Sequence, residues 1–287
     1  MENILEIKNL SKSYGNFKLD NISFNIEKGY IMGFIGPNGA GKTTTIKLIM
    51  NLIKRNSGEI KVFGLDNINH EKEIKSRIGF VYDESNYYEN LSVKDNAKLI
   101  ADFYEKWSWT EFDRYINIFG LDKKQKIKEL SKGMKTKFSL ATALSHEAEL
   151  LLMDEPTSGL DPVSKQEIIN ILQEYIEDGN KSVLFSTHII SDIEKMADYV
   201  TFINKGKIVF SEEKLKIEDE YRIVKGGLDI LESISEEDFI QIKRNKYGFS
   251  GLTKDYHKFQ NIYGSNIVVD KPNIEEIMLY MVGEKYE

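Results

Sequence analysis

Short runs of apolar residues, bounded by glycine or polar residues, recur along the chain and predict buried β-strands. The run YIMGFI at residues 30–35 stands directly before a glycine-rich stretch. The runs LLLM at residues 150–153 and SVLFS at residues 182–186 have the same continuous apolar character. Runs of this length are typical of strands that are covered on both faces, as in a parallel sheet.

Apolar residues at spacings of three and four predict amphipathic helices between these strands. The pattern occurs in residues 43–53, in residues 93–107 and in a helix that begins at Ser131, a good N-cap residue. The predicted buried faces are Ile46, Ile49, Met50 and Ile53; Val93, Ala97, Ile100, Ala101 and Tyr104; and Phe138, Leu140, Ala141 and Leu144. The tail has a strand-like run at residues 266–270 and a helical pattern after Pro272, so we expect a small packed appendage there.

The stretch GPNGAGKTT at residues 36–44 lies between the first strand and its helix. It matches GxxxxGK[ST], in which glycines let backbone N–H groups surround a phosphate at a helix N-terminus. Lys42 is expected to reach the β- and γ-phosphates of a nucleotide, and the Thr43 hydroxyl to ligate Mg²⁺. An ordinary glycine-rich turn is the alternative, which the four fixed positions and both flanking elements disfavour. The candidate nucleotide-binding residues are Gly36, Asn38, Gly39, Ala40, Gly41, Lys42, Thr43 and Thr44.

Two carboxylates, Asp154 and Glu155, end the apolar run at residues 150–153. The carboxyl ends of parallel strands form the crevice in which open α/β sheets bind ligands. Asp154 is therefore a candidate Mg²⁺ ligand, and Glu155 a candidate base for the attacking water. Standing alone, the pair would be read as an acidic cap of the following turn.

Composition narrows the function classes. The 287 residues carry a formal net charge of −7 with a pI near 5.4, which argues against a nucleic-acid partner. The chain has no cysteine, so disulfides and thiolate catalysis are excluded. No apolar run reaches the roughly 20 residues of a membrane-spanning helix, and the polar start MENILEIKN predicts no signal peptide. Any membrane role then needs a partner.

The segment LSKGM at residues 130–134 resembles the LSGGQ signature of the ATP-binding cassette (ABC) transporter family, with Lys132 and Met134 as departures. This resemblance implies that Ser131 and Gly133 contact ATP. It also implies that Tyr14 stacks on adenine, that SGLD at residues 158–161 crosses to a second subunit, and that His188 touches the γ-phosphate. The other histidines, His70, His146 and His257, have no motif and are expected to be solvated or locally hydrogen-bonded.

Asp83 stands where the family usually has a glutamine that helps to bind Mg²⁺ and links the nucleotide to the membrane subunit, and Glu84 is the next candidate. Asp83 is expected to approach the metal, as a third candidate ligand beside Thr43 and Asp154. Its coupling role is an open question, because a shorter anion replaces an amide.

The resemblance implies an α/β fold: a P-loop NTPase core with an antiparallel side sheet, a helical signature subdomain and a small C-terminal appendage. Residues 1–210 would form the ATPase domain, with a helical insert at about 84–149, and residues 211–287 an accessory region.

The implied function is ATP hydrolysis, with the cofactors ATP and Mg²⁺, that powers export of a drug, peptide or lipid. The single loop and single signature imply a homodimer or a heterodimer with a related ATPase subunit. The dimer would act at the cytoplasmic face of the membrane through a multispanning permease. The alternatives are a soluble non-transport ABC ATPase, a P-loop kinase, which has no need of LSKGM or SGLD, and a non-hydrolysing module, which would most simply lose Glu155 or His188.

Overall fold

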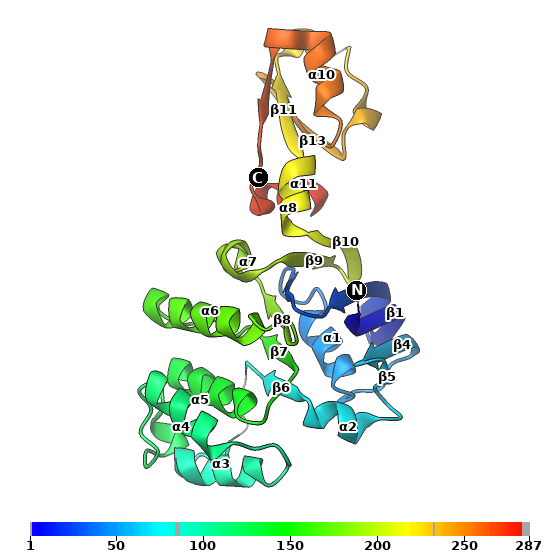
Figure 1. The fold of residues 1–287 in the computed structure, drawn as a ribbon. Coiled ribbons are helices and arrows are strands. Elements are labelled where there is room, and N and C mark those ends of the chain that lie inside the picture. The colour runs from blue at the N-terminus through cyan, green and yellow to red at the C-terminus, as the bar shows by residue number, and fades with distance from the viewer. Residues whose placement is uncertain (1, 84–86, 232, 283–287) are drawn as a thin grey trace. The chain divides into compact units, whose positions relative to one another are not determined.

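The computed structural model describes residues 2–83, 87–231 and 233–282. The chain divides into two compact units, Met1–Ser211 and Glu212–Glu287 (Figure 1). The predicted domain boundary after residue 210 lies one residue from this division. Within the described residues, no helix combines the length and the hydropathy that crossing a bilayer requires.

A six-stranded sheet of order β10-β9-β3-β8-β7-β6 forms the centre of the first unit. Strands β9, β3, β8, β7 and β6 pair in parallel, so their carboxyl ends meet at one edge. The three apolar runs that predicted buried strands lie in β3, β7 and β8, and every residue of these strands is buried. The bounds are β3 Ile31–Ile35, β6 Ile78–Val81, β7 Leu150–Asp154, β8 Ser182–Thr187, β9 Tyr199–Asn204 and β10 Lys207–Glu213.

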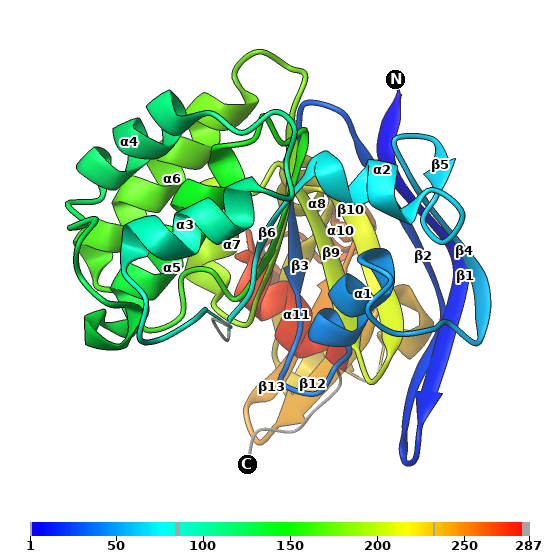
Figure 2. The ribbon, with the colours of Figure 1, turned by 90° about the horizontal axis from the view of Figure 1, so that it is seen from below.

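A second, antiparallel sheet of order β2-β1-β4-β5 covers one side of this centre (Figure 2). Its strands are β1 Asn3–Tyr14, β2 Phe17–Glu27, β4 Ser57–Val62 and β5 Leu65–Asp66. In β1, Ile7 pairs with Phe24 of β2 and with Ile60 of β4, and all three are buried. They share one core with Phe34 of β3 and Leu152 of β7. The predicted α/β class with an antiparallel side sheet is confirmed.

The helices of the first unit connect the strands, and α3 to α6 gather on the other side of the central sheet (Figure 2). Their bounds are α1 Lys42–Ile49, α2 Glu71–Ser76, α3 Val93–Ala101, α4 Trp109–Ile118, α5 Lys132–Leu144, α6 Pro162–Ile176 and α7 Ile190–Met196, with a 3₁₀ turn at Ile127–Glu129. Phe112 of α4 and Phe138 of α5 are fully buried against each other's rings. This aromatic contact packs the helical insert.

Two predicted helices end earlier than their patterns suggest. Helix α3 ends at Ala101, so the prediction of a helix to residue 107 is wrong. Tyr104 lies in the following turn, where its ring stacks on His146 at a centroid distance of 3.8 Å, and this tertiary contact replaces a place on the helix face. Ile53 likewise lies beyond the end of α1 and is half-buried.

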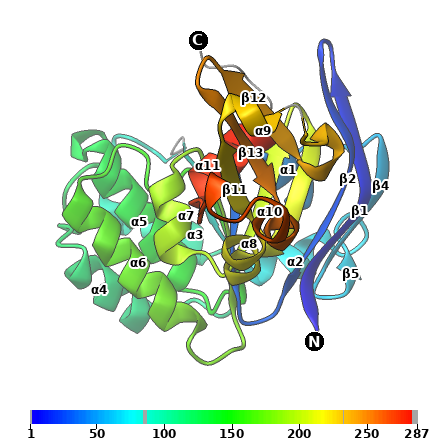
Figure 3. The ribbon, with the colours of Figure 1, turned by 90° about the horizontal axis from the view of Figure 1, so that it is seen from above.

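The second unit has its own four-stranded sheet of order β12-β13-β11-β14 (Figure 3). Phe259 of α10 packs with Phe239 and Phe249, whereas the Tyr280 hydroxyl of α11 donates to Ser250 Oγ at 2.8 Å. Because Phe249 and Ser250 are neighbours on β13, α10 and α11 cover opposite faces of this sheet. The bounds are α8 Lys214–Glu220, β11 Arg222–Gly226, α9 Leu228–Leu231, β12 Gln241–Asn245, β13 Gly248–Thr253, α10 Tyr256–Tyr263, β14 Ile267–Asp270 and α11 Ile274–Val282, with 3₁₀ turns at Glu236–Asp238 and Gly264–Asn266.

Candidate functional site

The glycine-rich loop connects the carboxyl end of β3 to the first residue of α1. A Cβ on Gly36 would meet the Ile203 carbonyl oxygen at 2.2 Å, so only glycine fits there. Gly41, the N-cap of α1, has φ +119°, a conformation that glycine adopts readily. Asn38 and Gly39 are exposed at the tip, Ala40 is buried, and Thr43 and Thr44 are half-buried on the first turn of α1.

Lys42 is buried, with 6% of its surface exposed, and its ammonium group lies under the loop. Lys42 Nζ donates to the carbonyl oxygen of Gly36 at 2.7 Å and to that of Pro37 at 3.4 Å. It also forms an ion pair with Glu155 at 3.4 Å. A buried cation needs such partners, because an unpaired charge in the interior is costly.

Asp154 and Glu155 stand at the end of β7 and are held by Ser186 of β8. Ser186 Oγ donates to Asp154 Oδ1 at 2.5 Å, and the Glu155 amide donates to the Ser186 carbonyl oxygen at 3.1 Å and to its Oγ at 3.2 Å. Asp154 is buried, whereas Glu155 has φ +51°, an uncommon conformation for a residue with a side chain. The backbone therefore turns sharply after Asp154 and aims the two carboxylates differently.

His188 follows β8 and completes a connected group at the carboxyl edge of the sheet. Its Nδ1 lies 2.8 Å from Glu155 Oε2, while Glu155 Oε1 faces Lys42. The structure thus brings together three residues that the sequence places at 42, 155 and 188. The imidazole is partly exposed and can be reached from solvent.

Ser131 and Gly133 lie elsewhere, at the start of α5 on the helical insert. Ser131 Oγ accepts the Met134 amide at 3.2 Å, so the predicted N-cap is present. A Cβ on Gly133 would lie 2.9 Å from Leu160 Cδ2, so the signature packs closely on the SGLD segment. Asp161 of that segment caps α6 by accepting the amides of Val163 and Ser164.

Tyr14 ends β1 with a half-exposed ring, and Lys12 Nζ lies 4.8 Å from the ring centroid. One ring face is therefore covered by a cation.

Asp83 lies two residues after β6 and forms an ion pair with Lys132 of the signature, Oδ1 to Nζ, at 2.7 Å. Two of the three positions at which the sequence departs from the resembled family are thus in contact. Glu84 lies outside the described residues.

Three contributors to this region, Ser186, Lys47 and Tyr82, were not predicted from the sequence. Ser186 orients both carboxylates, and its signal is a hydroxyl at the end of an otherwise apolar strand. Lys47 Nζ of α1 lies 5.4 Å from the centroid of the Tyr82 ring, and the Tyr82 side chain raises the pKa of this lysine. No spacing rule connects residues 47 and 82 before the fold is known.

One histidine prediction is wrong. His70 and His257 are exposed, but His146 is buried, and its Nδ1 has no hydrogen-bond partner among the described residues. Burial lowers the pKa of His146 to about 4, so the ring is neutral at pH 7. The stack on Tyr104 explains why an imidazole is accommodated there.

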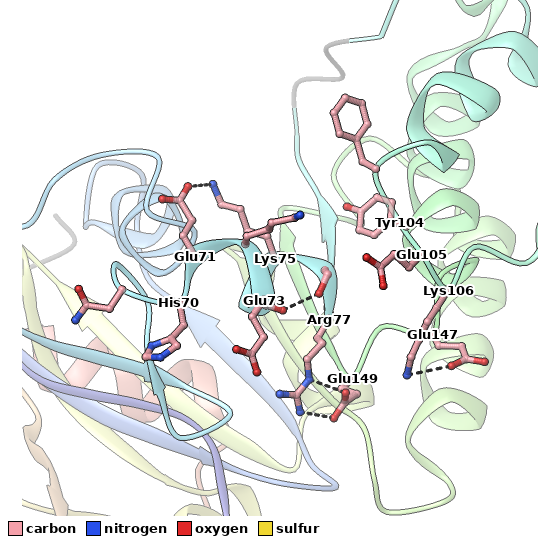
Figure 4. A pocket seen from close by; sticks show the side chains of 14 residues that line it. His70, Glu71, Glu73, Lys75, Arg77, Tyr104, Glu105, Lys106, Glu147 and Glu149 are labelled. Carbon is pink, nitrogen blue, oxygen red and sulfur yellow. Dashed lines mark hydrogen bonds and ion pairs between the residues drawn. The ribbon is translucent and has the colours of Figure 1, made fainter.

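A pocket of about 1030 Å³ lies away from these residues, between α2 and the segments that flank α3 and α5 (Figure 4). Arg77 donates two hydrogen bonds to Glu149 at 2.7 and 2.8 Å on its floor. Lys106 pairs with Glu147 on its rim. Phe103, also on the rim, exposes 82% of its side chain, which is unusual for a phenylalanine.

Comparison with known proteins gives a match to the family model described as ABC transporter over residues 19–158. The bacitracin transport ATP-binding protein BcrA of Bacillus licheniformis is 37% identical over 212 residues, which cover 73% of this chain and 69% of that protein. The lantibiotic transport ATP-binding protein SrtF of Streptococcus pyogenes is 37% identical, over 73% of this chain and 91% of that protein.

A third relative extends the likeness to the second unit. The uncharacterized ABC transporter ATP-binding protein YdbJ of Bacillus subtilis (strain 168) is 30% identical over 99% of this chain and 89% of its own length. Among solved structures, an ATP-binding subunit of an ABC transporter has a TM-score of 0.69 with 27% identity, over 75% of this chain and 92% of that chain. The dimeric cassette MJ0796, solved with ADP and Pi, shares the fold with a TM-score of 0.66 at 24% identity, over 73% of this chain and 98% of that chain.

Proposed function

This chain belongs to the ABC transporter family as an ATP-binding ATPase, and we propose that it powers export of a drug, peptide or lipid through a separate multispanning permease. The ATPase activity follows from the family. Two relatives are named for transport of bacitracin and of a lantibiotic, which supports a peptide cargo. The contact of Lys42, Glu155 and His188 at one edge of the sheet carries the proposal, because it assembles the groups that hydrolysis needs.

The loop at residues 36–44 would hold the triphosphate through its backbone N–H groups and Lys42. ATP would draw the Lys42 ammonium away from the Gly36 and Pro37 carbonyl groups, which already direct it toward the interior of the loop. Tyr14 would stack on the adenine with the ring face that Lys12 leaves free.

The donor set fits Mg²⁺ bound jointly with phosphates. The Thr43 hydroxyl and the Asp154 carboxylate are hard oxygen ligands, and Mg²⁺ commonly takes only one or two carboxylates besides phosphates and water. Among the described residues no cluster of three or more His, Asp or Glu side chains could hold a metal alone, which agrees with such a shared site. Asp83 is the third candidate ligand, with its carboxylate engaged by Lys132. Bound Mg²⁺ would neutralise charge on the β- and γ-phosphates.

Glu155 would orient and deprotonate the attacking water, and His188 would hold Glu155 while its other ring nitrogen faces the γ-phosphate. The salt bridge to Lys42 keeps Glu155 near the loop before the nucleotide binds. Ser186 fixes the backbone at Glu155, so the carboxylate needs little rearrangement.

We propose that two chains act together, as a homodimer or with a related ATPase subunit. Each chain has one phosphate loop and one signature, and Ser131 and Gly133 lie on the helical insert rather than beside Lys42. Ser131 and Gly133 of one chain would contact the ATP held by the other chain. Hydrolysis of the bound ATP would then allow the two chains to separate.

We propose that the permease docks at the pocket between α2 and the helical insert, which places the chain at the cytoplasmic face of the membrane. The pocket has a volume of about 1030 Å³, and Phe103, one of its lining residues, offers an exposed apolar contact. Its paired charges supply partners for polar residues of the same segment (Figure 4).

Glu155→Gln tests the proposed chemistry. The amide keeps the size of the side chain but cannot accept a proton, so ATP hydrolysis should fall by about 10²–10⁴-fold while ATP still binds. The measurement is phosphate release by the purified chain and by its complex with the permease, together with the affinity for a fluorescent ATP analogue.

Glu177→Gln, a change of an exposed glutamate at the end of α6, is the matched control and should hydrolyse ATP like the wild type. Hydrolysis by Glu155→Gln above a tenth of the wild-type rate would remove Glu155 from this role.

A further inference from the structure

We propose that Asp83 and Lys132 form a positioning pair that holds the first turn of the signature helix α5 to the end of β6 and so sets the rate of ATP hydrolysis. The inference rests on the proposed function, because it deepens the role of the signature. It assigns to Asp83 a contact with the signature, and to Lys132 a function in a motif that usually has glycine at this position.

The pair joins two parts of the cassette that are distant in sequence. Asp83 follows β6 of the central sheet, and Lys132 is the first residue of α5 on the helical insert. Their charged atoms are 2.7 Å apart, a short distance for a lysine–carboxylate pair. The Lys132 side chain also lies along the SGLD segment, since a Cβ on Gly159 would be 3.8 Å from Lys132 Cδ.

The electrostatics of α5 explain why this pair matters. The first turn of α5 has no acidic residue but contains Lys132 and Lys135, both unfavourable near the positive end of a helix dipole. The compensating carboxylates come from the segment after β6: Asp83 pairs with Lys132, and Glu89 lies 3.8 Å from Lys135. That segment therefore supplies the negative charge that the helix sequence lacks.

The other side of Asp83 is connected to the phosphate loop. Lys47 Nζ of α1 lies over the ring of Tyr82, the neighbour of Asp83, at 5.4 Å from the ring centroid. Helix α1 begins at Lys42 of the loop. The dipeptide Tyr82-Asp83 thus connects the helix that follows the phosphate loop to the helix that carries the signature.

Asp83→Asn, Lys132→Gln and the charge exchange Asp83→Lys/Lys132→Asp test the pair in the full-length chain. An exposed ion pair contributes up to about 1 kcal/mol, which corresponds to about a five-fold effect. Each single variant should lower kcat by about three- to five-fold with the KM for Mg·ATP unchanged, and the exchange should restore kcat to within two-fold. If Asp83 acted as a metal ligand instead, Asp83→Asn would raise the KM for Mg·ATP. Lys132→Gln would then leave both kcat and KM unchanged.

Amide hydrogen exchange of residues 132–136 without nucleotide gives a readout that does not depend on activity. Amide hydrogen exchange should become faster in both single variants. It should return to the wild-type rate in the double variant Asp83→Lys/Lys132→Asp. This measurement separates the positioning pair from the proposed function. A chain that neither binds nor hydrolyses ATP would contradict the proposed function, but its hydrogen exchange rates would still test the Asp83–Lys132 pair.

The matched control is the charge exchange Glu89→Lys/Lys135→Asp at the other lysine of the first turn of α5, where the charges are farther apart. This double variant should keep both kcat and the rate of amide hydrogen exchange within two-fold of the wild type. The proposal would be overturned if the single variants kept the wild-type kcat and hydrogen exchange rate. It would also be overturned if the Asp83→Lys/Lys132→Asp variant did not recover them.

Discussion

At the scale of single residues, Ser186 is the side chain on which both carboxylates of the candidate site depend. Its hydroxyl donates to Asp154 and accepts the amide of Glu155, whose positive φ is a strained conformation for a glutamate. Strain of this kind costs about 1–3 kcal/mol and persists where neighbouring contacts enforce it. The hydroxyl of one buried serine thus fixes the direction of two functional groups.

Ser186→Ala should lower ATP hydrolysis by about ten-fold or more. Hydrogen bonds to charged groups contribute about 1.5–3 kcal/mol, and the variant leaves the buried Asp154 carboxylate with fewer donors. Steady-state turnover at saturating Mg·ATP is the measurement, with urea unfolding to verify the fold. Ser139→Ala in α5, a buried serine outside the site, is the control and should retain turnover. Wild-type turnover in Ser186→Ala would show that the carboxylates hold their positions without it.

The phosphate loop and both carboxylates could be predicted from the sequence because local geometry determines them. Glycines at fixed spacing in a strand-to-helix turn identify the phosphate loop, and the loop in turn favours a functional reading of the two acidic residues at the end of an apolar run. Ser186 and the Asp83–Lys132 pair depend on which strands and helices become neighbours, and no local pattern contains that information. The roles assigned to the individual site residues stay predictions that the variants above test.

At the scale of elements, the helical insert is built around aromatic contacts at its start and end. Tyr104 follows α3, and His146 follows α5, so their stack joins the two ends of the insert. The sequence could not reveal this contact, because its periodicity assigns Tyr104 to a helix face that ends earlier in the structure, and His146 stands in no motif. The strands were easier to predict, since burial on both faces leaves a continuous apolar run.

Acid should destabilise this insert through His146. Its pKa is about 4 in the folded chain and about 6.5 when unfolded, so below pH 6.5 the unfolded chain binds a proton that the folded chain does not. Stability that is present above pH 6.5 is lost as the pH falls, by about 2 kcal/mol at pH 5.

His146→Phe keeps a ring to stack on Tyr104 but has no group to protonate, so it should lose less stability than the wild type between pH 7.5 and pH 5. The measurement is urea unfolding at both pH values, monitored by tryptophan fluorescence because Trp107 and Trp109 lie in the insert. His257→Phe, a change of an exposed histidine, should follow the wild type. Equal pH dependence in wild type and His146→Phe would contradict the burial argument.

At the scale of the whole molecule, the chain combines two units that each have a hydrophobic core. In the first unit the core lies between the two sheets, and in the second it includes Val224, Phe249 and Phe259. A unit with its own core can unfold by itself. The 99% coverage by one relative indicates that the second unit accompanies the cassette in at least one other protein.

Phe259→Ala should therefore destabilise the second unit and spare the ATPase. The ring is buried against Phe239, and removing a buried phenylalanine costs about 3–5 kcal/mol, much of the stability of so small a unit. Calorimetry of the full-length variant should show one unfolding transition at a lower temperature. The midpoint temperature of a second transition should still rise when Mg·ATP is added, because only the cassette binds Mg·ATP.

The corresponding substitution in the first unit is Phe112→Ala, in the helical insert. It should lower the midpoint temperature of the transition that responds to Mg·ATP and leave the temperature of the other transition unchanged. ATP affinity within two-fold of the wild type in Phe259→Ala would assign nucleotide binding to the first unit alone. A single transition that both substitutions lower together would show that the two cores unfold as one, and the second unit would then have to be treated as part of the ATPase.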